Sequence, residues 1–419
     1  MSSGLRDRIH AEMESLHTID CHSHTSLKSE YNAHGGLDLF SLMAYYEREI
    51  NMATGVGSGQ LYDGCATDKD RWERLKPVLL RTRNESYWRH NIVTYKAVFD
   101  FADDDLDDSN WSALNETIKR RTSDPEWYHK VTKDIAKVKT QILNVPWFGD
   151  WEPEYFTCTL RMEGALELHN ADNRKGLEEH LDVSITDLYR LKAALVQLIQ
   201  QYKDRGSVGI KLAHAYRRTL ASEPVAEATA SCVFDRALKG EALCWPDRKA
   251  LEDHLIFFMA EVACELDQVF QIHTGVQGNW GHIPDSNPLG LLPLIHANKS
   301  TKFDLFHAGY PFSRELGMMG KHCGNVWLNM AWMYVITMEG SRQSMSEWID
   351  LVPGDRILGF GSDVHWPEMV YSHLIMARSC LADVLATKVE RDFLSETTAM
   401  SLVHQLLHDN AVTLYGLDA

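Results

Sequence analysis

The chain has 419 residues, of which 44% are hydrophobic and 24% charged, with 12 prolines and 26 glycines. This composition excludes low-complexity disorder, collagen and small disulfide scaffolds, because the share of hydrophobic residues is large enough for a core and neither Pro nor Gly is in excess. The 59 acidic and 42 basic residues give a formal net charge of −17. Such a surface disfavours binding to nucleic acid or to an anionic membrane.

Eight cysteines lie far apart without a Cys-x-x-Cys pair, so the sequence contains neither a zinc ribbon nor a redox pair. Reduced thiols of this kind predict a cytoplasmic protein. The first twenty residues lack the apolar centre of a secretion signal, and no uninterrupted apolar run reaches about 18 residues. We therefore expect neither a leader nor a membrane span.

Short apolar runs recur along the chain, and each is followed by a loop and then a helical pattern. This rhythm is typical of βα units. Eight such units predict an α/β fold, a (β/α)8 TIM barrel that spans residues 1–419 as a single domain. The expected strands are Thr18–Cys21, Gln141–Val145, Tyr155–Arg161, Val208–Leu212, Val269–His273, Lys302–His307, Val326–Met330 and Ile357–Asp363.

A long stretch at about residues 38–136 separates the first two strands and mixes aromatic and charged residues at helical spacing. We expect it to form a helical insertion. Within it, glycines and small residues gather at positions 51–64 and predict a mobile loop over the site. Further helices are expected at residues 185–202, 249–266 and 287–297, and the tail at 395–417 is expected to form two more.

Four histidines and one aspartate stand where predicted strands end. His22 and His24 end the first strand and share one face of it, because strand side chains alternate. His273, His307 and Asp363 end the fifth, sixth and eighth strands. The carboxyl ends of all strands open on one face of a parallel barrel, so these side chains should converge there. Since imidazole and carboxylate groups bind divalent ions, the sequence predicts a metal centre.

Lys211 ends the fourth strand, where a buried lysine requires a reason. It can be carboxylated and bridge two metal ions, remain an ammonium that neutralises an anionic substrate, or extend to solvent. Tyr216 and Arg217 follow it, and an arginine directed into the mouth of the barrel suits a carboxylate. Three aromatic residues near the expected ligands are candidates for the pocket wall: Trp280, Trp332 and Trp366.

The pattern of His-x-His on strand one, Lys on four, His on five and six, and Asp on eight resembles the amidohydrolase superfamily of metal-dependent (β/α)8 barrels. The later motifs HTG, HAGYPF, LGFGSDVHWPE and HDNAVTLYGL are similar to the amidohydrolase-related (amidohydrolase 2) branch, which contains decarboxylases, hydratases and lactone hydrolases. GIK…AYRR together with HTG and HAGYP is most similar to the amidohydrolase-like domain that is fused to glutamine synthetase in some proteins. The long helical insertion resembles that of uronate isomerases.

The resemblance implies that His22, His24 and Asp363 hold a divalent ion, zinc or else manganese, with His273 as a further ligand. His307 would be a ligand to a second metal or a group that polarises the substrate. In hydrolytic members the aspartate of strand eight takes a proton from metal-bound water and hands it to the leaving group. One ion is favoured over two, because one is the rule in this branch.

These expectations predict a metal-dependent hydrolase that cleaves an amide C–N or lactone C–O bond in a small carboxylate-bearing substrate, with Asp363, His307 and Lys211 as catalytic residues. The alternative is a decarboxylase or a uronate or sugar-acid isomerase on the same barrel. A metal-stabilised scaffold without turnover is least favoured, since it needs no acidic proton shuttle. The expected partner is a small-molecule substrate, and a homo-oligomer stays open.

Overall fold

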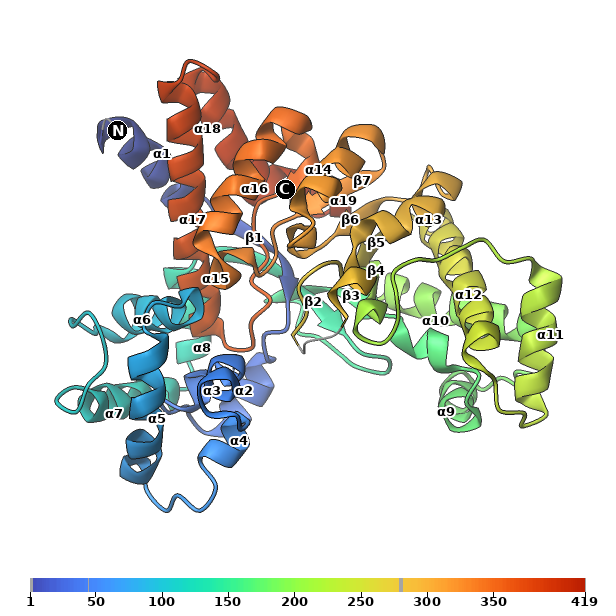
Figure 1. The fold of residues 1–419 in the computed structure, drawn as a ribbon, viewed down its shortest axis with the longest axis horizontal. Helices are drawn as coiled ribbons and strands as arrows, with labels where there is room; N and C mark the ends of the chain where they lie inside the picture. Colours follow the sequence, from blue (N-terminus) through green and yellow to red (C-terminus); the bar gives the residue numbers. More distant parts are fainter. Residues whose placement is uncertain (1–2, 44, 279–281, 419) are drawn as a thin grey trace.

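The computed structural model describes residues 3–418 except residue 44 and residues 279–281. Eight parallel strands pair in chain order and lie at the centre of the molecule (Figure 1). Backbone hydrogen bonds from Cys21 N to the Phe360 carbonyl and from Asp363 N to the His22 carbonyl join the segment after the last strand to the first. The predicted (β/α)8 barrel is therefore confirmed. The strands are β1 Thr18–Ser23, β2 Val138–Val145, β3 Phe156–Arg161, β4 Ser207–Leu212, β5 Val269–Ile272, β6 Phe303–Leu305, β7 Val326–Asn329 and β8 Ile357–Leu358.

Most predicted strand ends agree with the structure to within two residues, but β8 ends five residues early and β6 loses residues at both ends. β6 ends at Leu305 and β8 at Leu358, whereas the apolar pattern extended them to His307 and Asp363. Both of these residues themselves have positive φ, 61° and 50°, a backbone conformation that does not occur in an extended strand. The polar residues thus lie in turns above the strands.

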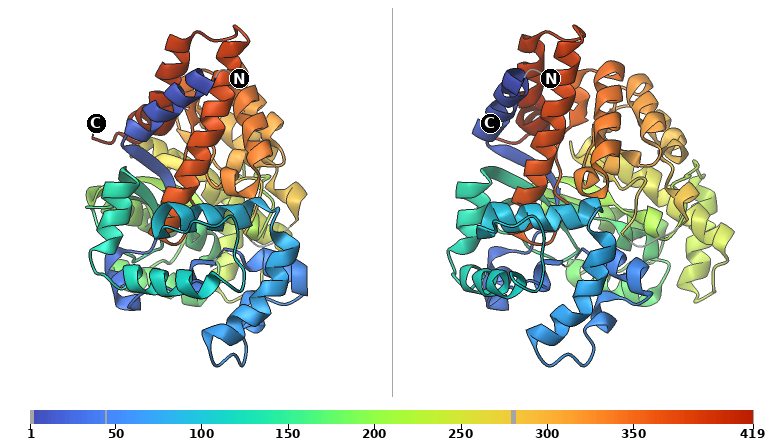
Figure 2. Two further views of the ribbon diagram at one scale, coloured as in Figure 1. Left: turned by 90° about the vertical axis from the view of Figure 1, so that its left-hand side faces the viewer. Right: turned by 60° about the vertical axis from the view of Figure 1, so that its left-hand side comes forward.

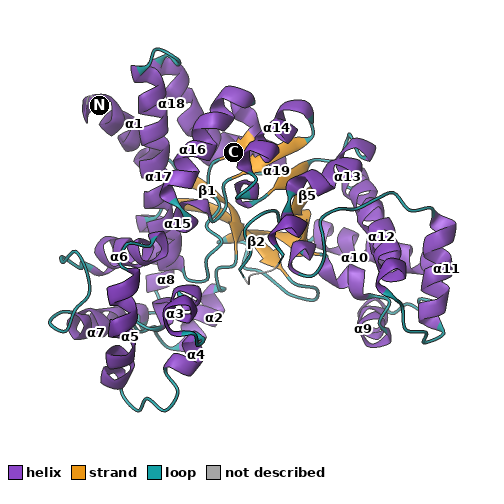
Figure 3. Ribbon diagram, in the orientation of Figure 1, coloured by secondary structure: helices purple, strands orange, loops and turns teal. Residues whose placement is uncertain are grey.

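Helices surround the strands on all sides in Figure 3. α10 illustrates how the sequence specifies them: Asp187 caps it by accepting a hydrogen bond from Arg190 N, and its buried leucines face the barrel. The predicted helix at 287–297 begins as a 3-10 turn, Pro288–Leu291, before it becomes α-helical. The helices outside the insertion are α1 Ser3–Ser15, α9 Ala171–Leu181, α10 Leu188–Asp204, α11 Glu227–Leu238, α12 Trp245–Glu265, α13 Leu292–Ala297, α14 Ser313–His322, α15 Met333–Ile336, α16 Met338–Leu351, α17 Pro367–Glu390, α18 Glu396–His404 and α19 Asn410–Tyr415.

The segment between β1 and β2 is a helical insertion, as predicted, and lies beside the barrel in Figures 1 and 2. The predicted loop at 51–64 is wrong in part, because α3 continues to Thr54 and a further helical turn, α4, follows it. The insertion consists of α2 Lys28–His34, α3 Glu47–Thr54, α4 Ser58–Leu61, α5 Asp68–Thr82, α6 Ser86–Phe99, α7 Trp111–Thr122, α8 Trp127–His129 and the π-helical segment Lys130–Ile135.

α17 ties these parts together, because it packs against α6 of the insertion, α16 and α1, which runs alongside it in Figure 2. Among the described helices it alone is long and apolar enough to cross a membrane by length and composition. However, 78% of its most apolar window is buried inside the fold. Its apolar character is therefore that of a core helix.

A polar layer fills the barrel beneath the strand ends. Thr159 on β3 donates to Gln271 on β5 at 2.9 Å, and Asn329 on β7 donates to Asp304 on β6 at 3.0 Å. Tyr415 of α19 reaches this layer and bonds both Gln271 and Asp304. α19 also packs on Ile19 and Val269 at the starts of β1 and β5, so it closes the end of the barrel opposite the site.

Candidate active site

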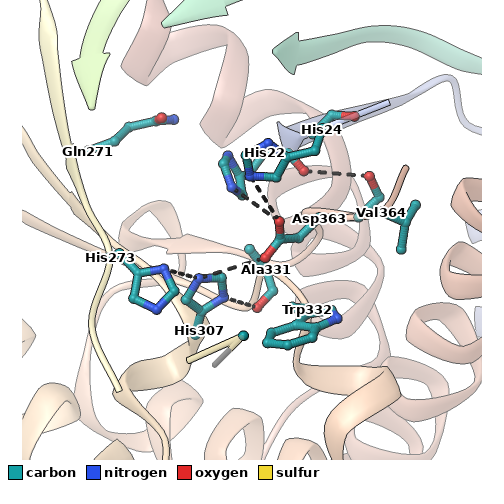
Figure 4. A network of polar contacts seen from close by, with 12 residues as sticks. His22, His24, Gln271, His273, His307, Ala331, Trp332, Asp363 and Val364 are labelled. Carbon is teal, nitrogen blue, oxygen red and sulfur yellow. Dashed lines mark hydrogen bonds and ion pairs between the residues drawn. The ribbon is translucent and has the colours of Figure 1, made fainter. Parts of the chain in front are cut away.

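Three of the predicted ligands meet above the barrel (Figure 4). His22 lies in β1, His24 follows it, and Asp363 lies in the turn after β8. The Nε2 atoms of His22 and His24 lie 3.4 and 3.3 Å from the same carboxylate oxygen, Oδ1 of Asp363. One donor atom from each residue lies within 4.8 Å of the others. Two imidazoles and a carboxylate at this spacing fit one divalent cation and leave positions open for substrate or water.

The protonation states agree with this donor set. Burial lowers the pKa of His22 and His24, so both imidazoles are neutral, the form that binds metal. Burial by itself would raise the pKa of Asp363, but the adjacent imidazoles of His22 and His24 bring it well below its usual range. These shifts favour an ionised carboxylate beside two neutral imidazoles.

Asp363 is held mainly by its backbone. Its N–H donates to the His22 carbonyl at 2.9 Å. The preceding residue, Ser362, donates its N–H to Asp20 Oδ1 at 2.8 Å and accepts at its carbonyl from His373 Nδ1 at 2.9 Å. These bonds from β1 and α17 fix the turn in which the carboxylate faces the two histidines.

His273 and His307 form a second imidazole pair. His307 Nε2 lies 2.9 Å from His273 Nδ1, while His307 Nδ1 and His273 Nε2 lie 2.9 and 2.8 Å from the carbonyls of Ala331 and Val276. A carbonyl only accepts, so those outer nitrogens carry the ring protons of the neutral imidazoles. The facing nitrogens then both present lone pairs, and a cation, either a proton or a metal ion, is required to bring them together. The group of possible ligand atoms formed by His22, His24 and Asp363 does not include His273, whose ligand role stays a prediction.

Lys211 lies in β4 and is 1% exposed, so the interpretation in which its side chain extends to solvent is wrong. Its Nζ lies 3.5 Å from the centroid of the Phe306 ring and has no hydrogen-bond partner among the described residues. Burial lowers its pKa to about 7. Burial is consistent with the two other predicted roles of Lys211, a carbamate and an ammonium that faces the substrate.

The predicted pocket residues divide into two groups. Tyr216 lies beside the site, with its ring 4.7 Å from that of His273, and Trp332 lies 6.1 Å from the ring of His307. Arg217 instead pairs with Glu167, with 64% of its side chain exposed, on a separate cavity of 240 Å³. Trp366 packs on His365 and donates to the Ser41 carbonyl. Trp280 lies outside the described residues.

Three further residues next to the site were not predicted from the sequence. Arg161 ends β3, and after burial its charge contributes to lowering the pKa of both His24 and Lys211. Tyr45 lies in the insertion, where burial and then the charge of Asp363 raise its pKa. Arg48 of α3 stacks on Trp332, with its guanidinium carbon 5.1 Å from the ring centroid. Arg161 ends a strand, as the predicted ligands do, so the same sequence pattern could have identified it. No local pattern in the sequence indicates that the insertion, with Tyr45 and Arg48, packs over the site.

Comparison with known proteins agrees with this geometry. The sequence is 26% identical to the protein fluG of Emericella nidulans in an alignment of 227 positions, which covers 51% of this chain and 26% of that protein. The fold is similar to that of uronate isomerase from Thermotoga maritima, with a TM-score of 0.83, 17% identity, and coverage of 99% of this chain and 98% of that one. Glucuronate isomerase from Caulobacter crescentus gives a TM-score of 0.82 at 16% identity, covering 99% and 94% of the two chains.

The family model described as amidohydrolase matches residues 185–417, from before α10 to beyond α19 and more than half of the chain. It covers the later predicted site residues, from Lys211 to Asp363, while His22 and His24 join them in space. The resemblance seen in the sequence is therefore confirmed: the chain belongs to the amidohydrolase family, and it is a metal-dependent enzyme of the amidohydrolase superfamily.

Proposed function

We propose that the enzyme is a hydrolase that cleaves an amide C–N or lactone C–O bond in a small carboxylate-bearing substrate. The orientation of Asp363 is the observation that carries this proposal. Its Oδ1 faces His22 and His24, while its Oδ2 faces His307 Nε2 at 3.8 Å. His22, His24 and Asp363 together form the ligand cluster. Because the Asp363 carboxylate also faces the imidazole of His307, it is placed to take a proton from a nucleophile and pass it on.

His22, His24 and Asp363 would hold the ion, with His273 as a further ligand; zinc suits this donor set best, and manganese is the alternative. When bound, the ion supplies a Lewis acid that polarises a carbonyl oxygen and lowers the pKa of water toward ~7. We propose one ion rather than two, because the ammonium of Lys211, seated against the Phe306 ring, would repel a second cation.

The remaining groups bind the substrate and manage its protons. When His273 Nδ1 binds the ion, His307 Nε2, which lies 3.8 Å from Asp363 Oδ2, is free to take the proton from that carboxylate and to protonate the leaving group. Lys211 and Arg161 place two positive charges near the ligand cluster. Arg161 Nε already pairs with Glu163 Oε2 at 3.3 Å, so Lys211 is the cation that remains for an anionic group at the reacting end of the substrate. Tyr216 and Trp332 form the walls beside the imidazole pair.

A second candidate is the isomerisation of a uronate or related sugar acid. The likeness in fold to two proteins named uronate and glucuronate isomerases, which covers 99% of this chain and so includes the insertion, favours it. That reaction moves a proton between neighbouring carbons and adds no water, so the same carboxylate and imidazoles serve it.

Solvent labelling separates the two reactions. Zinc-loaded protein is incubated in H2¹⁸O with N-acyl amino acids, amino acid amides, lactones and uronates, and the products are analysed by mass spectrometry. We expect one ¹⁸O atom in the carboxylate of a hydrolysis product. Deuterium at carbon in D2O, or release of carbon dioxide, without ¹⁸O in the new carboxylate would contradict the hydrolase. Protein treated with chelator is the control.

A further inference from the structure

A large cavity adjoins the candidate site where the insertion meets the barrel. Its volume is 630 Å³, within the range of about 300–1,000 Å³ that is typical of small-molecule pockets. Trp332 and Val276 belong to its wall. Both also contact the site, because the Trp332 ring lies 6.1 Å from that of His307 and the Val276 carbonyl accepts from His273 Nε2 at 2.8 Å. A substrate that reacts at the ligand cluster can therefore extend its other end into this cavity.

The insertion supplies two arginines to the cavity wall, and their surroundings differ. Arg89 is already bound, by Asp105 at 3.4 Å and by the Asp104 carbonyl at 3.2 Å. Arg48 donates Nε to the Gly278 carbonyl and stacks on Trp332, and it has no carboxylate partner among the side chains that the structure describes. Its terminal nitrogens are thus the donors that remain for an anionic ligand, and a single guanidinium suits a carboxylate.

Two glutamates lie on the same wall. Glu49 follows Arg48 on α3, and its Oε2 is buried without a hydrogen-bond partner among the described residues. Glu85 precedes α6 and borders the same cavity. Burial raises the pKa of Glu49 to about 7 and also raises that of Glu85. A ligand ammonium beside them would supply the missing partner and restore their charge.

We propose that this cavity binds the α-amino acid head of the substrate, with its carboxylate at Arg48 and its ammonium at Glu49 and Glu85. The inference rests on the proposed function and narrows its substrate class to amides on the side chain of an amino acid, which reach the ligand cluster past Trp332. Hydrolysis adds water across the C–N bond of that amide, so the acyl carbon gains a carboxylate oxygen and the released amine takes the proton. The α-amino acid head is unchanged.

Binding of the head is measured without turnover, by isothermal titration calorimetry. L-Glutamate carries both charged groups, glutarate lacks the ammonium and 4-aminobutyrate lacks the α-carboxylate. We expect L-glutamate to bind the wild-type protein and each analogue to bind about 10–100-fold more weakly, the range for the loss of one charged hydrogen-bonding group. L-Aspartate and L-glutamine are tested beside L-glutamate. Equal binding of glutamate, glutarate and 4-aminobutyrate would overturn the inference, and so would a failure of all three amino acids to bind.

Variants assign the two charges to residues. Arg48→Ala, or Arg48→Gln if the alanine variant fails to fold, should abolish the preference for glutamate over 4-aminobutyrate. Glu49→Gln should reduce the preference over glutarate. Arg89→Ala is the matched control, since its guanidinium is already bound, and it should keep both preferences; equal effects of Arg48→Ala and Arg89→Ala would contradict the assignment.

The inference and the proposed function can fail separately. If glutamate binds as expected but no amide is hydrolysed, the proposed function fails alone. If an N-acyl substrate is hydrolysed without dependence on the head, this inference fails alone.

Discussion

Positive backbone φ angles cluster in the candidate site. Ala308 and Trp332 have φ of 51° and 65°, and His307 and Asp363 have 61° and 50°. For residues other than glycine such conformations cost about 1–3 kcal/mol each and persist only where the surroundings impose them. At Asp363 the backbone bonds of this residue and of Ser362 do so. The site thus uses folding energy to direct an imidazole and a carboxylate toward each other.

Substitution of Asp363 separates its two roles. Asp363→Asn should keep the fold and much of the metal but lower kcat by about 10²–10⁴-fold, because the amide oxygen can still coordinate but cannot accept a proton. Metal content by elemental analysis and kcat on the same preparation check this. Asp363→Ala, which removes the ligand as well, should lose both. An undiminished kcat in a metal-bound Asp363→Asn variant would exclude the proton-transfer role.

The sequence predicted the residues that gather at the candidate site because they obey a rule that is local to each strand. An apolar run followed by a polar residue marks a carboxyl end, and a parallel barrel brings all such ends together. It did not predict Arg48 or Tyr45, since their place over the site depends on how the insertion packs against the barrel. Arg217 shows the opposite failure, because it follows β4 closely yet turns away to pair with Glu167.

α17 and β1 act together as the support of the turn that carries Asp363. His373 on α17 donates to the Ser362 carbonyl, and Asp20 on β1 accepts from the Ser362 N–H. His373 is fully buried, and its ring lies 5.8 Å from that of His90 on α6. The insertion, α17 and the turn that carries Asp363 are therefore connected through the neighbouring rings of His90 and His373.

This connection predicts a difference between those histidines. His373→Leu should weaken zinc affinity by about 10–100-fold, the usual cost of losing a group that orients a ligand. His90→Leu is the matched control: His90 is equally buried but bonds the Met369 carbonyl and Ser372, not the ligand turn. Zinc affinity is measured by competition with a chromophoric chelator, and stability by urea unfolding. Equal losses of affinity in the two variants would assign the effect to general destabilisation.

Strand and helix types were predictable in most places, but the ends of β6 and β8 were not. An apolar run continues through Phe306 and Phe360, which are buried just as strand residues are. Sequence pattern records burial and not φ, so it cannot show where the chain leaves the sheet. The same limit applies to residues 51–64, where small residues suggested a loop although backbone hydrogen bonds form α3 and α4.

At the end opposite the site, the barrel is closed by α19 and by a layer of buried polar residues that the strand patterns did not predict. Asp304 is fully buried and accepts hydrogen bonds at Oδ2 from Asn329 and from Tyr415 of α19, whereas its Oδ1 has no partner among the described residues. Burial raises the pKa of Asp304 to about 7 despite these bonds. The closure therefore depends on the protonation of this carboxyl.

The sign of the resulting pH dependence follows from linkage. Between the ordinary aspartate pKa of 3.8 and the folded value of about 7, the folded protein retains a proton that the unfolded chain has lost. The contribution of Asp304 to stability is therefore complete below pH 3.8 and is lost as the pH rises toward 7. Asp20, whose pKa burial also raises to about 7, acts in the same direction.

Asp304→Asn keeps an acceptor for Tyr415 but removes the titrating group. The free energy of unfolding of the variant should fall less steeply with pH than that of the wild-type protein, by about 1.4 kcal/mol per pH unit between pH 5 and 6.5, which corresponds to one proton. Urea unfolding followed by circular dichroism at closely spaced pH values measures both slopes. Tyr415→Phe, which removes a hydrogen bond but leaves the carboxyl in place, should lower stability and retain the titration. Parallel profiles for Asp304→Asn and the wild-type protein would mean that Asp304 titrates normally and that the polar layer does not couple the C-terminal helix to pH.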